Sequence, residues 1–216
     1  MDEECTPPPG PEPKRPRRAE RNGRTRKQPR KVSPEYLENS ALHYLERFAS
    51  SAANLRRVLM RKVMLSASAH DTDPEEGAAW VDALIERYQR AGLLDDGAYA
   101  AMRARSINRQ GGPERAIRAK LAAKGVAAEH VDAAVDELRE DVGGDPDMAA
   151  AVALARRRGF GPFRRPSLSA KSLPPEERRM KELAAMARAG FSFDTATRVV
   201  DAGSPEDLEE DMAASS

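Results

Sequence analysis

Helical periodicity interrupted by turn residues between positions 84 and 126 constrains the fold more than any other feature of this sequence. Just before the first turn, apolar residues recur three and four positions apart, as on one face of a helix: Val81, Leu84, Ile85 and Tyr88. Gly92 follows where a left-handed helix end is expected. The Gly-Gly-Pro sequence at 111–113 is a second break, and Gly125 is a third. The stretch therefore predicts short helices joined by tight turns, one of them over 113–124.

Asp95 and Asp96 stand at the expected start of the next helix. Carboxylates at that position accept hydrogen bonds from the free N–H groups of the first helical turn. The helix would then place Tyr99, Met102 and Ser106 on its inner face. Paired carboxylates also occur in catalytic sites, but capping accounts for these two without such a role.

Similar patterns predict helices on both sides of this stretch. Ser33 can cap a helix from Pro34, and Ser50 or Ser51 can cap the following one. Residues 66–73 show no apolar periodicity, so we expect a flexible loop there before a helix that starts at Pro74. The expected inward-facing residues are Leu37, Ala41, Leu45 and Phe48; Leu55, Val58, Leu59 and Val63; Val131, Ala134, Val135 and Leu138; and Met148, Ala151, Val152 and Ala155.

An internal repeat supports three similar units. Near the end of the expected second helix of each unit, two apolar residues stand five positions apart: Val58 and Val63, Leu121 and Val126, Met186 and Phe191. We expect three-helix repeats over 33–94, 95–144 and 145–203, with an acidic tail over 204–216. A segment over 159–175 with several Gly and Pro residues is expected to be a surface loop of the third unit.

The composition fits an all-α protein with almost no strand. Apolar residues make up 40% of the chain, charged residues 33% and aromatic residues only 5%. The single cysteine, Cys5, excludes a disulfide framework and is consistent with a reducing cytoplasm. No apolar run approaches the roughly 20 residues that span a bilayer, and the N-terminus lacks the order of a signal peptide. We expect a soluble cytoplasmic monomer that does not bind a membrane.

Charge is strongly segregated along the chain, although the formal net charge is only +1. Residues 14–31 hold ten Lys or Arg against Glu20 alone, and residues 100–124 hold seven against Glu114 alone. Residues 201–216 hold six acids and no base. Residues 1–32 combine this basic run with clustered prolines, so we expect a disordered arm that is either a solubilising tail or a contact for nucleic-acid phosphates. Such polarity indicates a polyanionic partner.

The sequence offers few groups that could do catalysis. His43, His70 and His130 are far apart, and none stands at metal-ligand spacing with a cysteine or in an HExxH motif. There is no phosphate-binding GxxxxGK[ST] loop and no dinucleotide fingerprint. Trp80 fits a core position better than a contact surface. We therefore expect no enzyme activity, no cofactor and no resident metal.

Basic helix faces are the remaining candidate for function. Arg118 lies one residue from Ile117 and three from Leu121, so its guanidinium can leave the core face while its stem covers apolar surface. Several bases gather around this turn with hardly a compensating acid, and a similar group recurs in the first unit. The alternative is an ordinary solvated face. The candidate contacts, chosen by charge and helical position, are Arg56, Arg57, Arg61, Arg103, Arg109, Arg115, Arg118 and Lys124.

Three quoted segments resemble the RecX family of bacterial regulatory proteins: GLLDDGAYA, GGPERAIRAKL and the KGV that follows it. Weaker similarity continues over 41–62 and 179–200, so the resemblance covers roughly residues 36–203. It implies three tandem three-helix units in a curved, elongated row, as the internal repeat also indicates. The segment KRPRR resembles a nuclear import signal, but similarity to a bacterial family argues against that interpretation.

The same resemblance implies a non-catalytic regulator that binds the filament of RecA on single-stranded DNA. By the family's behaviour, the row would lie in the filament groove, inhibit RecA's ATP hydrolysis and strand exchange, and so modulate recombinational repair and the SOS response. The alternative is a stand-alone nucleic-acid-binding protein that gains nonspecific affinity from the basic arm. A third hypothesis is that the protein is a helical scaffold for an unrelated partner.

Overall fold

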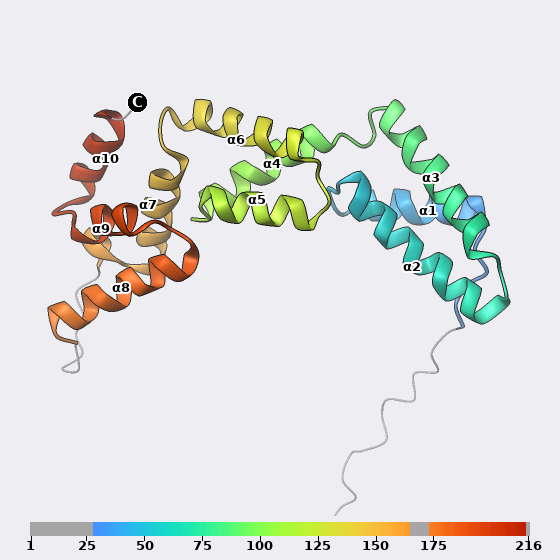
Figure 1. Ribbon diagram of the computed structural model, residues 1–216, viewed down its shortest axis with the longest axis horizontal. Coiled ribbons are helices and arrows are strands. Elements are labelled where there is room, and N and C mark those ends of the chain that lie inside the picture. Colours follow the sequence, from blue (N-terminus) through green and yellow to red (C-terminus); the bar gives the residue numbers. More distant parts are fainter. Residues whose placement is uncertain (1–27, 165–172, 215–216) are drawn as a thin grey trace, which may run out of the picture.

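The computed structural model describes residues 28–164 and 173–214, and all regular structure in these ranges is helical (Figure 1). The prediction of an all-α fold is therefore confirmed. In chain order the elements are α1 (Pro34–Leu45), α2 (Ala52–His70), α3 (Pro74–Arg90), α4 (Asp96–Arg109), α5 (Glu114–Ala123), α6 (Ala128–Val142), α7 (Pro146–Arg158), the short 3-10 helix η1 (Gly161–Phe163), α8 (Pro175–Ala189), α9 (Phe193–Asp201) and α10 (Pro205–Ala214).

The helices form three units in a curved row (Figure 1). Buried apolar residues fall into three separate clusters, one within residues 32–94, one within 99–138 and one within 148–208. The second helices of the three units, α2, α5 and α8, lie along the concave side of the row, and α3, α6 and α10 lie along the opposite side. The units therefore repeat in the same orientation along the arch.

The first unit begins and ends its helices largely where the sequence predicts. Ser33 accepts a hydrogen bond from Tyr36 N, and Ser51 accepts one from Asn54 N, so both serines cap as expected. Helix α1 stops at Leu45, however, and Phe48 lies beyond it with 52% of its surface exposed. The assignment of Phe48 to the inner stripe is therefore wrong.

The predicted loop over 66–73 is wrong for residues 66–70, because α2 continues to His70 and only residues 71–73 connect it to α3. Ser66 occupies an inward position of this last part of α2 and is fully buried. Its hydroxyl accepts a hydrogen bond from Val32 N at 2.9 Å and lies 3.0 Å from the Thr72 hydroxyl. A polar side chain can face the core when its hydrogen bonds are satisfied there, and apolar periodicity alone misses it.

The second unit packs α4 closely on α5 and α6 through small residues. The buried residues of α4 include Ala100, Ala104 and Ile107, whereas Met102 is 42% exposed and Ser106 is partly exposed. Only Tyr99 of the predicted inner face is buried. The small alanine side chains of α4 let the backbone of a neighbouring helix approach closely. For this reason alanines, and not the larger Met102, occupy the inner face of α4.

The third unit extends into the acidic end of the chain. Residues 205–214, expected to be a tail, form α10, and Leu208 is buried in the same cluster as Met186 and Val199. Ser204 caps the helix by accepting a hydrogen bond from Asp207 N, and Leu208 is buried against the core of the third unit. Of the predicted surface loop, residues 165–172 lie outside the described ranges, as do residues 1–27 of the basic arm.

Polar contacts join the first unit to the second. Ser51 donates its hydroxyl hydrogen to the carbonyl of Lys124 at 2.7 Å, and Ala52 N donates to Asp96 Oδ1 at 2.8 Å. Asp96 thus helps to cap α2 rather than only its own helix, which Asp95 caps through Ala98 N. A Cβ atom at Gly125 would stand 2.6 Å from Ala53 Cβ, so the two units meet at that glycine.

The second and third units meet through a more buried joint. Asn108 is buried and donates from Nδ2 to the carbonyl of Pro146 at 2.7 Å. Glu114 N donates to Asp147 Oδ1 at 2.6 Å, which places a carboxylate at the start of α5. A Cβ atom at Gly111 would lie 2.8 Å from Leu154 Cβ, so this joint also depends on close approach at a glycine.

Gly125→Ala should lower the free energy of unfolding by more than Gly92→Ala. Both glycines have positive φ, +75° and +71°, so an alanine costs on the order of 1 kcal/mol of backbone strain at either site. A Cβ at Gly92 meets nothing within 4 Å, whereas at Gly125 it collides with Ala53. Denaturant melts of the two variants would measure the difference, and equal losses would show that the joint does not need the close contact.

Candidate nucleic-acid interface

Two helices of the concave side, α2 and α5, are net basic. Helix α2 holds four Arg or Lys residues and no Asp or Glu. Helix α5 holds three bases against one acid. On the opposite side, α6 holds six acids and one Arg, and α10 holds five acids and no Arg or Lys. The row is therefore polarised across its width, basic on the concave side and acidic on the other.

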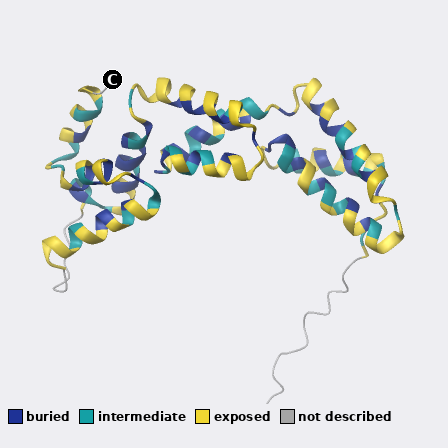
Figure 2. Ribbon diagram, viewed as in Figure 1, coloured by how far each residue is buried: buried dark blue, intermediate teal, exposed yellow. Residues whose placement is uncertain are grey.

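The solvent-facing sides of α2, α5 and α8 define what we call the concave face (Figure 2). Six exposed basic residues on these helices form no ion pair with another described residue. These residues are Arg57, Arg61, Arg115, Lys120, Lys181 and Arg188. Cations that have no carboxylate partner are free to meet phosphate oxygens or an acidic protein surface.

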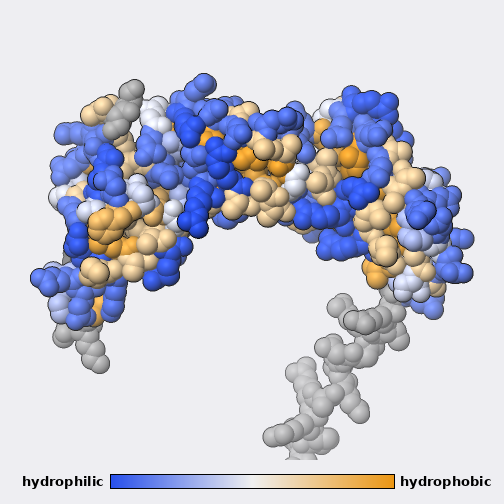
Figure 3. Space-filling view, viewed as in Figure 1, coloured by the Kyte–Doolittle hydropathy of each residue, from blue (hydrophilic) through white to orange (hydrophobic). Residues whose placement is uncertain are grey.

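Alanines separate the bases on α5. Ala119, Ala122 and Ala123 are exposed, and Figure 3 shows mildly hydrophobic surface over α5 with hydrophilic side chains at both ends. Small side chains keep the helix surface low, so a large partner can approach the backbone between the cations. The concave face therefore combines positive charge with a helix surface that a large partner can approach closely.

Two of the predicted contacts help to hold the joint between the first two units. Arg57 donates from Nη2 to the carbonyl of Ala123 at 2.9 Å, across 66 residues of sequence. Lys124 donates from Nζ to Asn54 Oδ1 at 3.3 Å. The structure thus brings Arg57 and Lys124 to the same joint.

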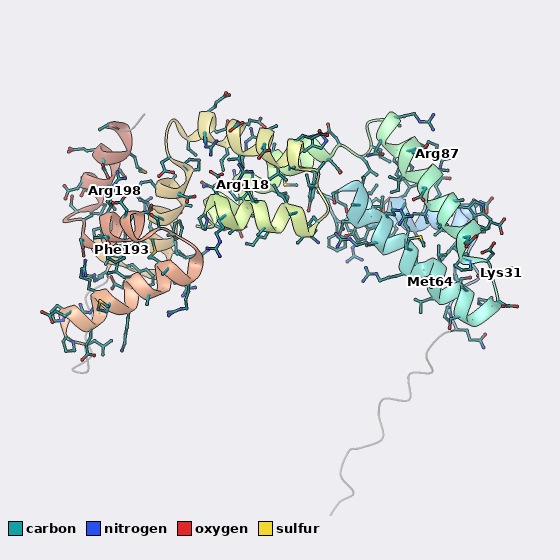
Figure 4. All side chains as sticks on the ribbon, in the orientation of Figure 1. Lys31, Met64, Arg87, Arg118, Phe193 and Arg198 are labelled. Carbon is teal, nitrogen blue, oxygen red and sulfur yellow. The ribbon has the colours of Figure 1, made fainter. Side chains whose placement is uncertain are left out.

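Two others are neutralised by carboxylates. Arg56 forms a bidentate pair with Asp82 of α3, and the pKa of Asp82 is lowered chiefly by that hydrogen bond. Arg118 lies between α5 and α6, where it pairs with Glu114 at 2.8 Å and with Asp132 (Figure 4). The expectation that the central cluster has hardly a compensating acid is therefore wrong for Arg118, because α6 supplies Asp132 from a distant part of the sequence.

Arg103 and Arg109 come from α4, which is not one of the three helices that line the concave side (Figure 1). Sequence reasoning also missed three residues that belong to the face: Lys120, Lys181 and Arg188. The internal repeat carried the missing signal, because α8 is the counterpart of α2 and α5. Its charge was hidden by Glu176, Glu177 and the buried Glu182 of the same helix.

Glu114 organises the charges around the start of α5. It accepts from Arg118 at 2.8 Å and from Arg139 at 2.8 Å. Burial works to raise its pKa, but the hydrogen bonds and positive charges of the two arginines together lower it below the usual value. At the same joint, burial is the main reason that the pKa of Asp147 is raised. Acid therefore has opposite effects on the stability that the two groups contribute: protonation of Glu114 destabilises the fold, whereas protonation of Asp147 stabilises it.

Glu114→Gln should make the protein less sensitive to acid. A folded-state pKa below the unfolded one adds stability that is present above the unfolded pKa and is lost as pH falls through the folded pKa. We expect the wild type to lose more stability than the variant between about pH 5 and pH 3. Urea midpoints at several pH values would measure it, with Glu140→Gln as control, since Glu140 is exposed on α6 without an ion pair to a described residue. Parallel curves for wild type and Glu114→Gln would contradict the role of the pairs.

The histidines do not come together. His43 is exposed beside Glu46, His70 ends α2 with Nε2 2.5 Å from the carbonyl of Pro29, and His130 lies on α6. The described residues hold no group of three His, Cys, Asp or Glu side chains with metal-site geometry. Within the same ranges, no helix is both long and apolar enough to cross a bilayer. Trp80 is partly buried and packs on the first cluster.

Comparison with known proteins identifies the family. A model described as "RecX, second three-helix domain" matches residues 95–135. The chain is 46% identical over 175 residues to regulatory protein RecX of Myxococcus xanthus (strain DK1622), which covers 81% of this chain and 89% of the relative. It is 36% identical over 165 residues to regulatory protein RecX of Agrobacterium fabrum (strain C58 / ATCC 33970), which covers 76% of this chain and 82% of that relative.

Solved structures agree at the level of the fold. A crystal structure of regulatory protein RecX superposes with a TM-score of 0.54 at 21% identity, over 78% of this chain and 72% of the other. The crystal structure of RecX from Lactobacillus salivarius gives a TM-score of 0.53 at 15% identity, over 82% of this chain and 97% of the other. With sequence identity of 36% and 46% to curated relatives over most of its length, this chain belongs to the RecX family of regulatory proteins.

Proposed function

We propose that this protein binds the RecA filament on single-stranded DNA and inhibits RecA's ATP hydrolysis and strand exchange, so that it modulates recombinational repair and the SOS response. The observation that carries the proposal is the concave face, where the second helices of three successive units present unpaired bases toward the same side of a curved row. A curved surface with this charge suits a polyanionic partner that is itself long and regular. Membership of a family of regulatory proteins, rather than of enzymes, supports a binding role.

The mechanism that follows is steric and electrostatic. Cations on α2, α5 and α8 attract the row into a groove of negative potential, and the length of the row blocks movement of the filament subunits that it spans. No side chain needs to enter the chemistry of ATP. Inhibition should therefore depend on salt, because the contact depends on charges exposed to solvent.

RecA's DNA-dependent ATPase, measured with this protein titrated in, tests the proposal. We expect the rate to fall as the protein approaches the concentration of RecA, and the inhibition to weaken as salt rises. An unchanged ATPase, combined with binding to naked DNA that survives physiological salt, would instead favour a stand-alone nucleic-acid-binding protein that uses the basic arm.

A further inference from the structure

An open apolar groove lies at the joint between the first and second units, and none of the six bases of the concave face lines it. It has a volume of about 580 Å³ and is lined by the end of α1, the linker between α1 and α2, the linker between α3 and α4, and the start of α4. Figure 3 shows hydrophobic surface beside that linker. The main apolar lining residues are Leu42, Leu45, Phe48, Leu93, Tyr99 and Met102.

The side chains that line this groove are unusually exposed for their size. Phe48 is 52% exposed, Leu93 53% and Met102 42%. Two acids, Glu46 and Asp95, stand among the lining residues, and no Arg or Lys does. Outside the lining, the Arg47 guanidinium lies 5.7 Å from the centre of the Phe48 ring. The groove therefore fits an occupant that is apolar and positively charged.

Residues 7–16 of this same chain have that composition. They read PPPGPEPKRP, with six prolines and the adjacent bases Lys14 and Arg15. Proline-rich segments bind aromatic-lined apolar grooves at low entropic cost, because proline restricts the unbound chain. We propose that the groove binds residues 7–16 of its own chain, with the prolines against Phe48 and Leu93 and the bases toward Glu46 and Asp95.

The segment can reach the groove. The described chain starts at residue 28, and Pro29 is held at the C-terminal end of α2 through its carbonyl and His70. The groove lies at the other end of α2, next to Ser50, and a helix of 19 residues is about 28 Å long. The twelve residues from 16 to 28 can span about 40 Å when extended. Residues 7–16 therefore have chain to spare.

Because the segment is tethered to the same chain, a groove of low affinity is enough to bind it for much of the time. A short flexible connection gives the segment an effective concentration on the order of 1 mM at the groove, so even millimolar affinity leaves the groove about half occupied. Binding at both ends would hold the intervening basic residues 17–27 against the first unit. These residues would then add to the positive charge of the first unit.

Methionine methyl NMR with a nitroxide on Cys5 tests this proposal on the full chain. Cys5 is the only cysteine and stands two residues before the proline cluster, so the label needs no engineered site. We expect the Met102 methyl signal to lose at least about half of its intensity, as half occupancy requires. Met1, four residues from the label, should be quenched in every sample, whereas Met180 on α8 of the third unit should keep its intensity.

Two further samples identify the occupant. Phe48→Ser with Leu93→Ser should restore the Met102 signal, and both side chains are exposed enough for the fold to tolerate the change. In a mixture of nitroxide-labelled chains with isotope-labelled chains that lack the nitroxide, Met102 should keep its intensity. Quenching of Met102 in that mixture would mean that the arm of a second copy occupies the groove. Absence of quenching in the chain that carries both the nitroxide and the isotope label would mean that the arm does not bind there. Either result would overturn the proposal.

Discussion

Replacing Arg115 and Lys120 together by Gln should weaken binding to the RecA–single-stranded DNA filament by roughly 10- to 30-fold at 0.1 M salt. Both side chains are exposed on α5 and form no ion pair with a described residue, so the change removes attraction without leaving a buried charge. Each phosphate contact to a single strand contributes about 0.7 to the slope of log K against log salt, so the variant's slope should be shallower by about 1.4. Filament binding measured across a salt series would give both quantities.

The matched control is Arg87→Gln with Arg90→Gln on α3. Arg87 lies on the side of the first unit away from the concave face and pairs with Glu38 at 2.6 Å (Figure 4). The control removes the same total charge, so a general loss of positive potential would affect both variants alike. If the α3 pair abolishes inhibition and the α5 pair leaves it intact, the concave face is the wrong surface.

Glutamine substitution at Arg118 would be a poor test of the same surface. Its guanidinium already lies between Glu114 and Asp132, and the hydrogen bond to Asp132 is the main reason that its pKa is raised. A change there alters the packing of α5 on α6 as well as the charge of the surface. Arg115, one turn away and unpaired within the described chain, separates the two effects.

Regular apolar periodicity made most of the helices predictable from sequence. The stripe of Leu84, Ile85 and Tyr88 is buried as expected, and Gly92 and Gly125 have the positive φ angles expected of residues that follow a helix. The third-unit positions that match the second by repeat, Met186 and Phe191, are buried like Leu121 and Val126. These signals are local, so a single sequence contains them.

The errors concern residues whose environment depends on a distant partner. Ser66 faces the core because Val32 N reaches its hydroxyl from 34 residues away, and Ala104 displaces Met102 from the inner face of α4 because α6 approaches closely. Arg118 is not an unpaired cation, because it forms an ion pair with Asp132 of the next helix. Apolar periodicity describes one helix at a time, whereas the burial and pairing of these side chains depend on the helix that packs against them.

The same limit applies to the candidate interface. Counting bases along residues 100–124 drew attention to α4 and α5 together, although only α5 lies on the concave side (Figure 1). Lys181 and Arg188 belong to the same face as Arg115 only because the third unit repeats the orientation of the second. A surface that crosses three units is a property of their stacking, which the local sequence does not contain.

Leu121→Ala should lower the free energy of unfolding by about 2–5 kcal/mol, because the change removes buried methyl groups and leaves a cavity. Leu121 is 1% exposed and packs with Ile117 and Val135 in the second cluster. Its neighbour Arg118 is more than a third exposed, so Arg118→Ala should cost about 1 kcal/mol or less despite two ion pairs. Denaturant melts of both variants at one pH would compare them directly. Similar losses would mean that α5 is rotated about its axis, and Arg115 would then no longer face the concave side.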